Sequence, residues 1–225
     1  RGYPTFAAGE EKTIFQLPRG YGYRYDPQDR WILNHMIHNL LPQEDTAYVT
    51  FDIDFVPMTA PGAAAIREAR PLWLDVAGLK PYPVFDVKRR WARPDGTYVF
   101  PDDARGPERA KIGSARRMTV DRPITLIGAA GHLHPGGLHA SMFAARGGQR
   151  REIFRSEARY WEPAGAVSWD VAMTATRPDW RVALRPGDEI SINATYDARR
   201  ASWYESMGIM LAWYAEGDDH GGVDP

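Results

Sequence analysis

Five of the six histidines in this 225-residue chain fall into two short clusters, and imidazole is a common metal ligand. In the first cluster, His132 and His134 are separated by one residue within the Gly-rich stretch 131–137. On a β-strand this spacing places both rings on one face, whereas Leu133 points to the other. The small residues at 128–131 leave room for a ligand or O₂ to approach. The pattern indicates one metal ion shared by two imidazoles.

The second cluster, at 34–39, contains His35 and His38 with a spacing of three residues. On a strand this spacing sends the two rings to opposite faces, so at most one can join a common site. We expect His38 at the rim, as a candidate fourth metal ligand, and His35 as a hydrogen-bonded core residue. His139 receives no assigned role, and His220 is expected in solvent.

Composition limits the other kinds of chemistry. The chain has no cysteine, so disulfides and thiolate metal sites are excluded, and a transition metal must be held by His, Met, Asp or Glu. Because 28 basic and 29 acidic side chains give a net charge of -1, we expect no nucleic-acid partner. No apolar run is long enough to predict a membrane span. The first residue is Arg1, which we interpret as a processed chain that is secreted or periplasmic.

Hydrophobic periodicity predicts an all-β fold. The 18 prolines and 21 glycines separate short segments in which apolar residues alternate with polar ones, as in 48–55 and 189–196. About a dozen strands suit an antiparallel β-sandwich of jelly-roll type. The other predicted strands are 12–17, 30–39, 71–76, 83–88, 96–101, 123–134, 138–145, 151–159, 180–184 and 204–214. The only expected helix is a short turn at 61–68.

We predict a single β-sandwich domain over 1–215, followed by a polar and disordered tail at 216–225. Within the domain, 89–122 is predicted as a long surface loop that carries one weak strand. The basic residues of this loop could attract an anionic partner, but interspersed acidic residues and the lack of an aromatic platform favour a solvated loop. A glycosylation sequon at Asn193 lies in a predicted strand and is interpreted as chance.

Three stretches follow one another in the second half of the chain: the His-x-His pair, the turn and strand start at 185–190, and the aromatic segment 204–214. In their order and spacing, residues 123–216 resemble the C-terminal copper domain of the type II ascorbate-dependent copper monooxygenases, which include peptidylglycine α-hydroxylating monooxygenase and dopamine β-monooxygenase. The resemblance implies one mononuclear copper with His132, His134 and Met207 as ligands. A thioether favours Cu(I), and imidazoles tolerate both oxidation states. Without the resemblance, Met207 would be read as a core residue.

Two departures separate this chain from that family. The family has two copper domains, and this chain is too short for both. The peptide-hydroxylating members bind a substrate carboxylate where this chain has Ala130, Ile209 and Leu211. An anion buried there without a partner would cost ~2–5 kcal/mol, so we do not expect a peptidylglycine substrate.

Three functions remain open at this stage. The first is monooxygenase-like redox chemistry at a copper site, with O₂ or peroxide and an external reductant, and with no catalytic residue assigned. The second is a copper carrier or storage protein that meets an electron-donor or copper-donor protein. The third is a β-sandwich module with incidental histidines. A cupin-like metal site is disfavoured because His139 stands at the place of the expected Glu. An enzyme needs an open coordination position, which the small residues at 128–131 favour.

Overall fold

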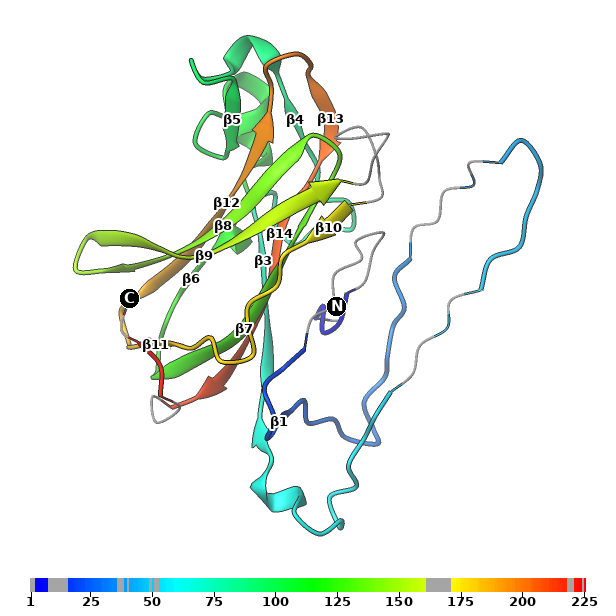
Figure 1. Cartoon of the computed structure of the whole chain (residues 1–225), viewed down its shortest axis with the longest axis vertical. Helices are drawn as coiled ribbons and strands as arrows, with labels where there is room; N and C mark the ends of the chain where they lie inside the picture. Colours follow the sequence, from blue (N-terminus) through cyan, green and yellow to red (C-terminus); the bar gives the residue numbers. More distant parts are fainter. Residues whose placement is uncertain are drawn as a thin grey trace.

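The predicted fold class is confirmed: the chain folds as two antiparallel sheets packed face to face in a sandwich (Figure 1). The computed structural model describes residues 3–7, 16–35, 39, 41–48, 50, 53–160, 171–217, 221–223 and 225. Within the described residues, no helix is long and apolar enough to cross a membrane.

The first sheet has the strand order β11-β7-β14-β3. Its strands are β3 (Arg70–Asp75), β7 (Ile124–Leu133), β11 (Val182–Leu184) and β14 (Gly208–Glu216). Because side chains alternate along a strand, Leu74, Leu133 and Met210 face the core, and their neighbours face outward. In the ladder between β7 and β14, His132 lies opposite Ile209.

The second sheet has the strand order β10-β9-β8-β12-β5, and β6 also pairs with β12. The strands are β5 (Thr97–Phe100), β6 (Arg117–Thr119), β8 (Gly137–Arg146), β9 (Gln149–Tyr160), β10 (Val171–Met173) and β12 (Glu189–Asp197). The strand predicted at 189–196 is confirmed as β12. Its apolar residues Ile190, Ile192, Ala194 and Tyr196 are buried between the sheets, as the alternation predicts.

Two small strand pairs complete the topology. β1 (Tyr21–Gly22) pairs with β2 (Arg67–Glu68), and β4 (Phe85–Val87) pairs with β13 (Trp203–Ser206). The segment expected as a helical turn at 61–68 contains only the short 3-10 turn η1 (Ala63–Ala65). In Figure 1, β4, β5 and β13 lie together at one end of the sandwich, and β11 lies at the other.

The N-terminal part of the chain differs from the prediction. Its described residues within 30–39 and 48–55 form no strand, and Ile53 and Phe55 are 61% and 65% exposed. An alternating pattern becomes a strand only where a neighbouring strand supplies ladder hydrogen bonds. Figure 1 shows the described residues between 24 and 60 as extended chain beside the sandwich. Phe6 and Tyr23, by contrast, pack against Trp213 on the outer face of the first sheet.

The segment 89–122 contains more regular structure than a surface loop with one weak strand. It includes β5, β6 and the 3-10 turns η2 (Arg89–Trp91), η3 (Gly106–Lys111) and η4 (Ser114–Arg116). Tyr98 and Phe100 of β5 are fully buried in the core. In the C-terminal tail, Val223 forms a bridge with Val182 of β11. Asn193 of the sequon is only 8% exposed within β12, so its amide is not accessible for glycosylation.

One partly buried ion pair joins β8 and β12 at one end of their ladder. The Arg146 guanidinium donates two hydrogen bonds, of 2.8 and 2.7 Å, to the carboxylate of Asp188. The same carboxylate accepts the backbone N–H of Arg185, which closes the turn into β12. The hydrogen bonds from Arg146 hold the pKa of Asp188 below its ordinary value.

Replacing Asp188 with Ala should lower the free energy of unfolding at pH 7 by about 2 kcal/mol, because Arg146 loses a bidentate partner. Since the folded-state pKa is depressed, this contribution is present above the unfolded pKa of about 3.9 and is lost as pH falls through the folded value. Urea unfolding at neutral and acidic pH measures the difference. The exposed Asp121→Ala is the matched control, and an equal loss in both variants would contradict the assignment.

Candidate metal site

The two histidines of the His-x-His pair lie next to each other at the end of β7, as the spacing predicts. Their ring centroids are 5.2 Å apart and the ring planes meet at 82°. A metal bound about 2.0 Å from a ring nitrogen lies about 3.2 Å from that ring's centroid. Two such rings with centroids 5.2 Å apart subtend an angle of about 110° at the metal, which is near tetrahedral. The separation of the two rings is therefore compatible with one shared ion, provided that a nitrogen of each ring faces it.

His134 is oriented by a backbone carbonyl. Its ring is 3% exposed, and Nδ1 lies 2.5 Å from the carbonyl oxygen of Glu205. Since a carbonyl only accepts, Nδ1 carries the proton and Nε2 is the nitrogen that would bind a metal. Metal-binding histidines are held in this way, with the second ring nitrogen donating to a carbonyl or carboxylate.

The carbonyl that orients His134 belongs to a residue with an unusual backbone. Glu205 has a φ of 54°, in the left-handed region, which costs a non-glycine residue about 1–3 kcal/mol. The surrounding structure must hold this conformation. The backbone N–H of Glu205 donates to the Asp86 carboxylate at 3.4 Å, which fixes one side of the residue.

His132 is neutral at physiological pH. Packing around its ring, and secondarily the neighbouring His134, lower the pKa of His132 to about 3, although part of the residue's surface remains accessible. A histidine must be neutral to bind a metal, so no proton has to be removed before binding.

Met207 stands directly before β14, beside the histidine pair. In the β7–β14 ladder, Gly208 pairs with Leu133 and Ile209 pairs with His132. Extending this register by one residue places Met207 opposite His134, on the same face. Met207 is 6% exposed, yet it belongs to neither of the two hydrophobic clusters that the described residues form. Met207 is thus a buried apolar residue whose side chain stands at the histidine end of the ladder.

A single buried hydroxyl joins the backbones on which His134 and Met207 stand. Tyr196, on β12 of the opposite sheet, is fully buried. Its hydroxyl accepts the N–H groups of His134 and Met207, each at 3.2 Å, and donates to the Met207 carbonyl at 2.6 Å. The sequence identified Tyr196 only as an inward-facing residue, since nothing in its pattern indicates the partners of its hydroxyl. We call this hydroxyl and its three hydrogen bonds the Tyr196 clamp. The clamp fixes the spacing between the end of β7 and the start of β14.

Three glycines beside the pair are required by packing. A side chain on Gly131 would lie 2.9 Å from Ser156, and one on Gly137 would lie 2.8 Å from Leu133. A side chain on Gly136 would collide with the Trp203 ring. Glycine is required here because other side chains already fill the space.

Of the other histidines, the two that the structure describes, His35 and His139, do not extend the site. His38, the candidate fourth ligand, and His220 lie outside the described residues. His35 is exposed, so its assignment to the core was wrong. His139 lies on β8 of the other sheet, between Thr195 and Glu157 of the neighbouring strands. In the part of the chain that the structure describes, no group of three or more His, Cys, Asp or Glu could hold a metal.

Comparison with known proteins gives no relative: no protein-family model matches the chain, and no curated protein matches it.

Replacing Tyr196 with Phe should lower the free energy of unfolding by about 3 kcal/mol, because two N–H groups and one carbonyl lose their shared partner. Tyr98→Phe is the matched control, since the Tyr98 hydroxyl is buried without a hydrogen-bond partner in the described structure and lies on the strand beside Tyr196. That change should be neutral or stabilising. Urea unfolding and amide exchange at His134 and Met207 measure both, and equal effects would contradict the clamp.

Proposed function

We propose that this protein binds one copper ion through His132, His134 and Met207 and carries out monooxygenase-like redox chemistry there. The observation that carries the proposal is the orientation of His134. Its Nδ1 contacts the Glu205 carbonyl, and its ring centroid lies 5.2 Å from the ring centroid of His132. This arrangement directs one imidazole nitrogen and fixes its tautomer, as in protein metal centres.

The donor set favours copper over other metals. Two imidazoles and a thioether suit an ion that is soft when reduced, and the chain has no thiolate to attract zinc or iron. Oxygen-binding ions such as Mg²⁺ and Ca²⁺ would require carboxylates, and none has been assigned to this site. The resemblance of 123–216 to copper monooxygenases supports the same ion.

Copper, when bound, would supply one-electron redox chemistry and a coordination position for O₂ or peroxide. The protein's own groups bind and orient. His134 is held by Glu205, His132 is already neutral, and the Tyr196 hydroxyl keeps the His134 and Met207 backbones at a fixed spacing. A preset geometry reduces the rearrangement required when the oxidation state changes.

The immediate ladder partners beside His132 are apolar, which supports a neutral or apolar substrate. His132 pairs with Ile209, and Ala130 pairs with Leu211, which in turn pairs with Trp73 of β3; beyond Ile209 the row ends in the buried acid Asp75 of β3. None of these partners could compensate the charge of a carboxylate.

With a single copper site, the second electron would come from an external reductant or an electron-donor protein. A secreted or periplasmic location would suit such a protein.

A second candidate function is a copper carrier without turnover. Two observations favour it: His134 and Met207 are more than nine-tenths buried, and neighbouring side chains fill the space beside the glycines. A carrier can close its coordination shell, whereas an enzyme must keep one position open. A copper-donor or copper-acceptor protein would then be the partner.

His132→Ala and His134→Ala should abolish binding of about one copper per chain, because each removes an imidazole ligand. Met207→Leu should weaken Cu(I) at least about tenfold and shift the redox potential, with a smaller effect on Zn(II). Met210→Leu, a fully buried core change three residues along, is the matched control. Competition titrations and potentiometry measure both variants, and equal results would place Met207 outside the site.

The rate of O₂ consumption by copper-loaded protein in the presence of a reductant distinguishes the two candidate functions. An enzyme should consume O₂ faster than free copper at the same concentration, and His134→Ala should abolish the excess because the ion is no longer held. A carrier should show no excess in either form.

Glycine-extended peptides should not be amidated, since no side chain assigned to the site would bind their carboxylate. An oxygen electrode and product analysis measure these outcomes, and efficient amidation would overturn the apolar-substrate argument.

A further inference from the structure

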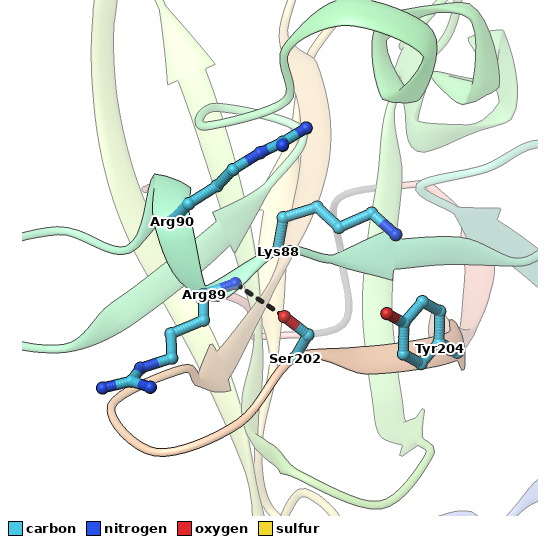
Figure 2. Close-up of a pocket in the computed structure, with 5 residues that line it drawn as sticks. All are labelled: Lys88, Arg89, Arg90, Ser202 and Tyr204. Carbon is cyan, nitrogen blue, oxygen red and sulfur yellow. Dashed lines mark hydrogen bonds between the residues drawn. The ribbon is translucent and has the colours of Figure 1, made fainter.

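An open pocket of about 640 Å³ lies where the chain after β4 meets the chain entering β13. It is lined by Lys88, Arg89, Arg90, Ser202 and Tyr204, and Figure 2 shows these five side chains. Three cations and two hydroxyl groups form this lining, without a carboxylate. The volume falls in the range of small-molecule sites in proteins.

The lysine of the pocket is held in place by its neighbours. Lys88 Nζ lies 3.0 Å from the Asp86 carboxylate and 4.4 Å from the centroid of the Tyr204 ring. Figure 2 shows its side chain extended toward Tyr204. Asp86 also approaches Lys111, at 3.7 Å, but Lys111 lies closer to Glu108, at 3.1 Å. The two lysines are thus balanced by two carboxylates, and the surplus positive charge of the pocket comes from its arginines.

The two arginines of the pocket lack acidic partners. In the described part of the chain, neither Arg89 nor Arg90 has a carboxylate within 4.0 Å of its guanidinium nitrogens. Arg89 Nε donates to the carbonyl of Arg199 at 3.1 Å, and the Arg90 guanidinium lies 4.9 Å from the Trp91 ring. Neutral groups thus position both guanidinium groups without compensating their charge.

The two hydroxyl residues supply further polar groups. Ser202 Oγ accepts the backbone N–H of Arg89 at 3.0 Å, which leaves its own hydroxyl hydrogen to donate (Figure 2). Tyr204 is 68% exposed at the pocket surface. In Figure 2 the Arg89 and Arg90 guanidinium groups point to different sides of the lining. An oxygen anion would therefore accept hydrogen bonds from one guanidinium group and a neighbouring hydroxyl or ammonium group, while the other arginine adds its positive charge. Guanidinium groups bind carboxylate and phosphate with two parallel hydrogen bonds.

We propose that this pocket binds a small organic anion through its carboxylate or phosphate group. The sequence favoured solvation for all basic residues of 89–122, because acidic residues are interspersed there. The fold instead brings Arg89 and Arg90 to hydroxyl groups from 202–204, more than a hundred residues away, and pairs the nearby acids elsewhere. The anion site does not depend on the metal, and metal-free protein is sufficient to test it.

The test is a titration of metal-free protein with inorganic phosphate and with citrate at low ionic strength, followed by calorimetry and by ³¹P line widths for phosphate. Wild-type protein should bind at least one of the two anions saturably at a single site. Arg89→Gln/Arg90→Gln should weaken this binding at least about tenfold, because both uncompensated charges are lost. Thermal unfolding checks that the variant is folded.

The matched control is Arg150→Gln/Arg151→Gln on β9, which removes the same charge from another surface. It should leave the affinity within about twofold of wild type, since general attraction by net charge is weak at a distance. Preference for phosphate or for citrate distinguishes the two anion classes. Equal weakening in both double variants, or no saturable binding of either anion to wild type, would overturn the proposal.

Discussion

The pairing of β7 with β14 is the constraint on which the candidate metal site depends. His132 lies in β7 and His134 directly follows Leu133 at its end, while Met207 directly precedes β14. Because side chains alternate along a strand, a shift of one residue in the register would turn Met207 to the opposite face from the histidines. The site exists only in the observed register.

Packing and two hydroxyl groups secure that register. Gly131 fits against Ser156, whose hydroxyl accepts the Gly131 N–H at 3.0 Å, so β7 is held from the side of the second sheet. At the strand ends, the Tyr196 hydroxyl binds the backbones of His134 and Met207. Buried backbone groups without partners are costly, so this hydroxyl stabilises the fold and presets the site with the same bonds.

One short strand contributes to both the candidate metal site and the proposed anion pocket. In β13, the Glu205 carbonyl orients His134, and the preceding Tyr204 presents its ring at the anion pocket. The left-handed backbone of Glu205 lies between these two environments. In the candidate metal site His134 and Met207 are buried and His132 is partly accessible, whereas the pocket is open and polar. The two sites therefore differ in the access they give to molecules from solvent.

The sequence determined the local features of this protein. The His-x-His spacing was sufficient to place His132 and His134 on one face, and the alternation at 189–196 was sufficient to define β12, because both depend only on the period of a strand. The absence of cysteine likewise limited the possible ligands of a transition metal to His, Met, Asp and Glu. Alternation at 48–55 failed because a strand also needs a neighbour, which the pattern does not contain.

Tertiary structure decided the contacts between distant residues. The Tyr196 hydroxyl reaches His134 across 62 positions, and the Glu205 carbonyl reaches it across 71. Glycines 131, 136 and 137, which suggested open space, prove to be filled by Ser156, Trp203 and Leu133. No periodicity encodes such partners, because they follow from how the two sheets pack and from which residues meet at the strand ends.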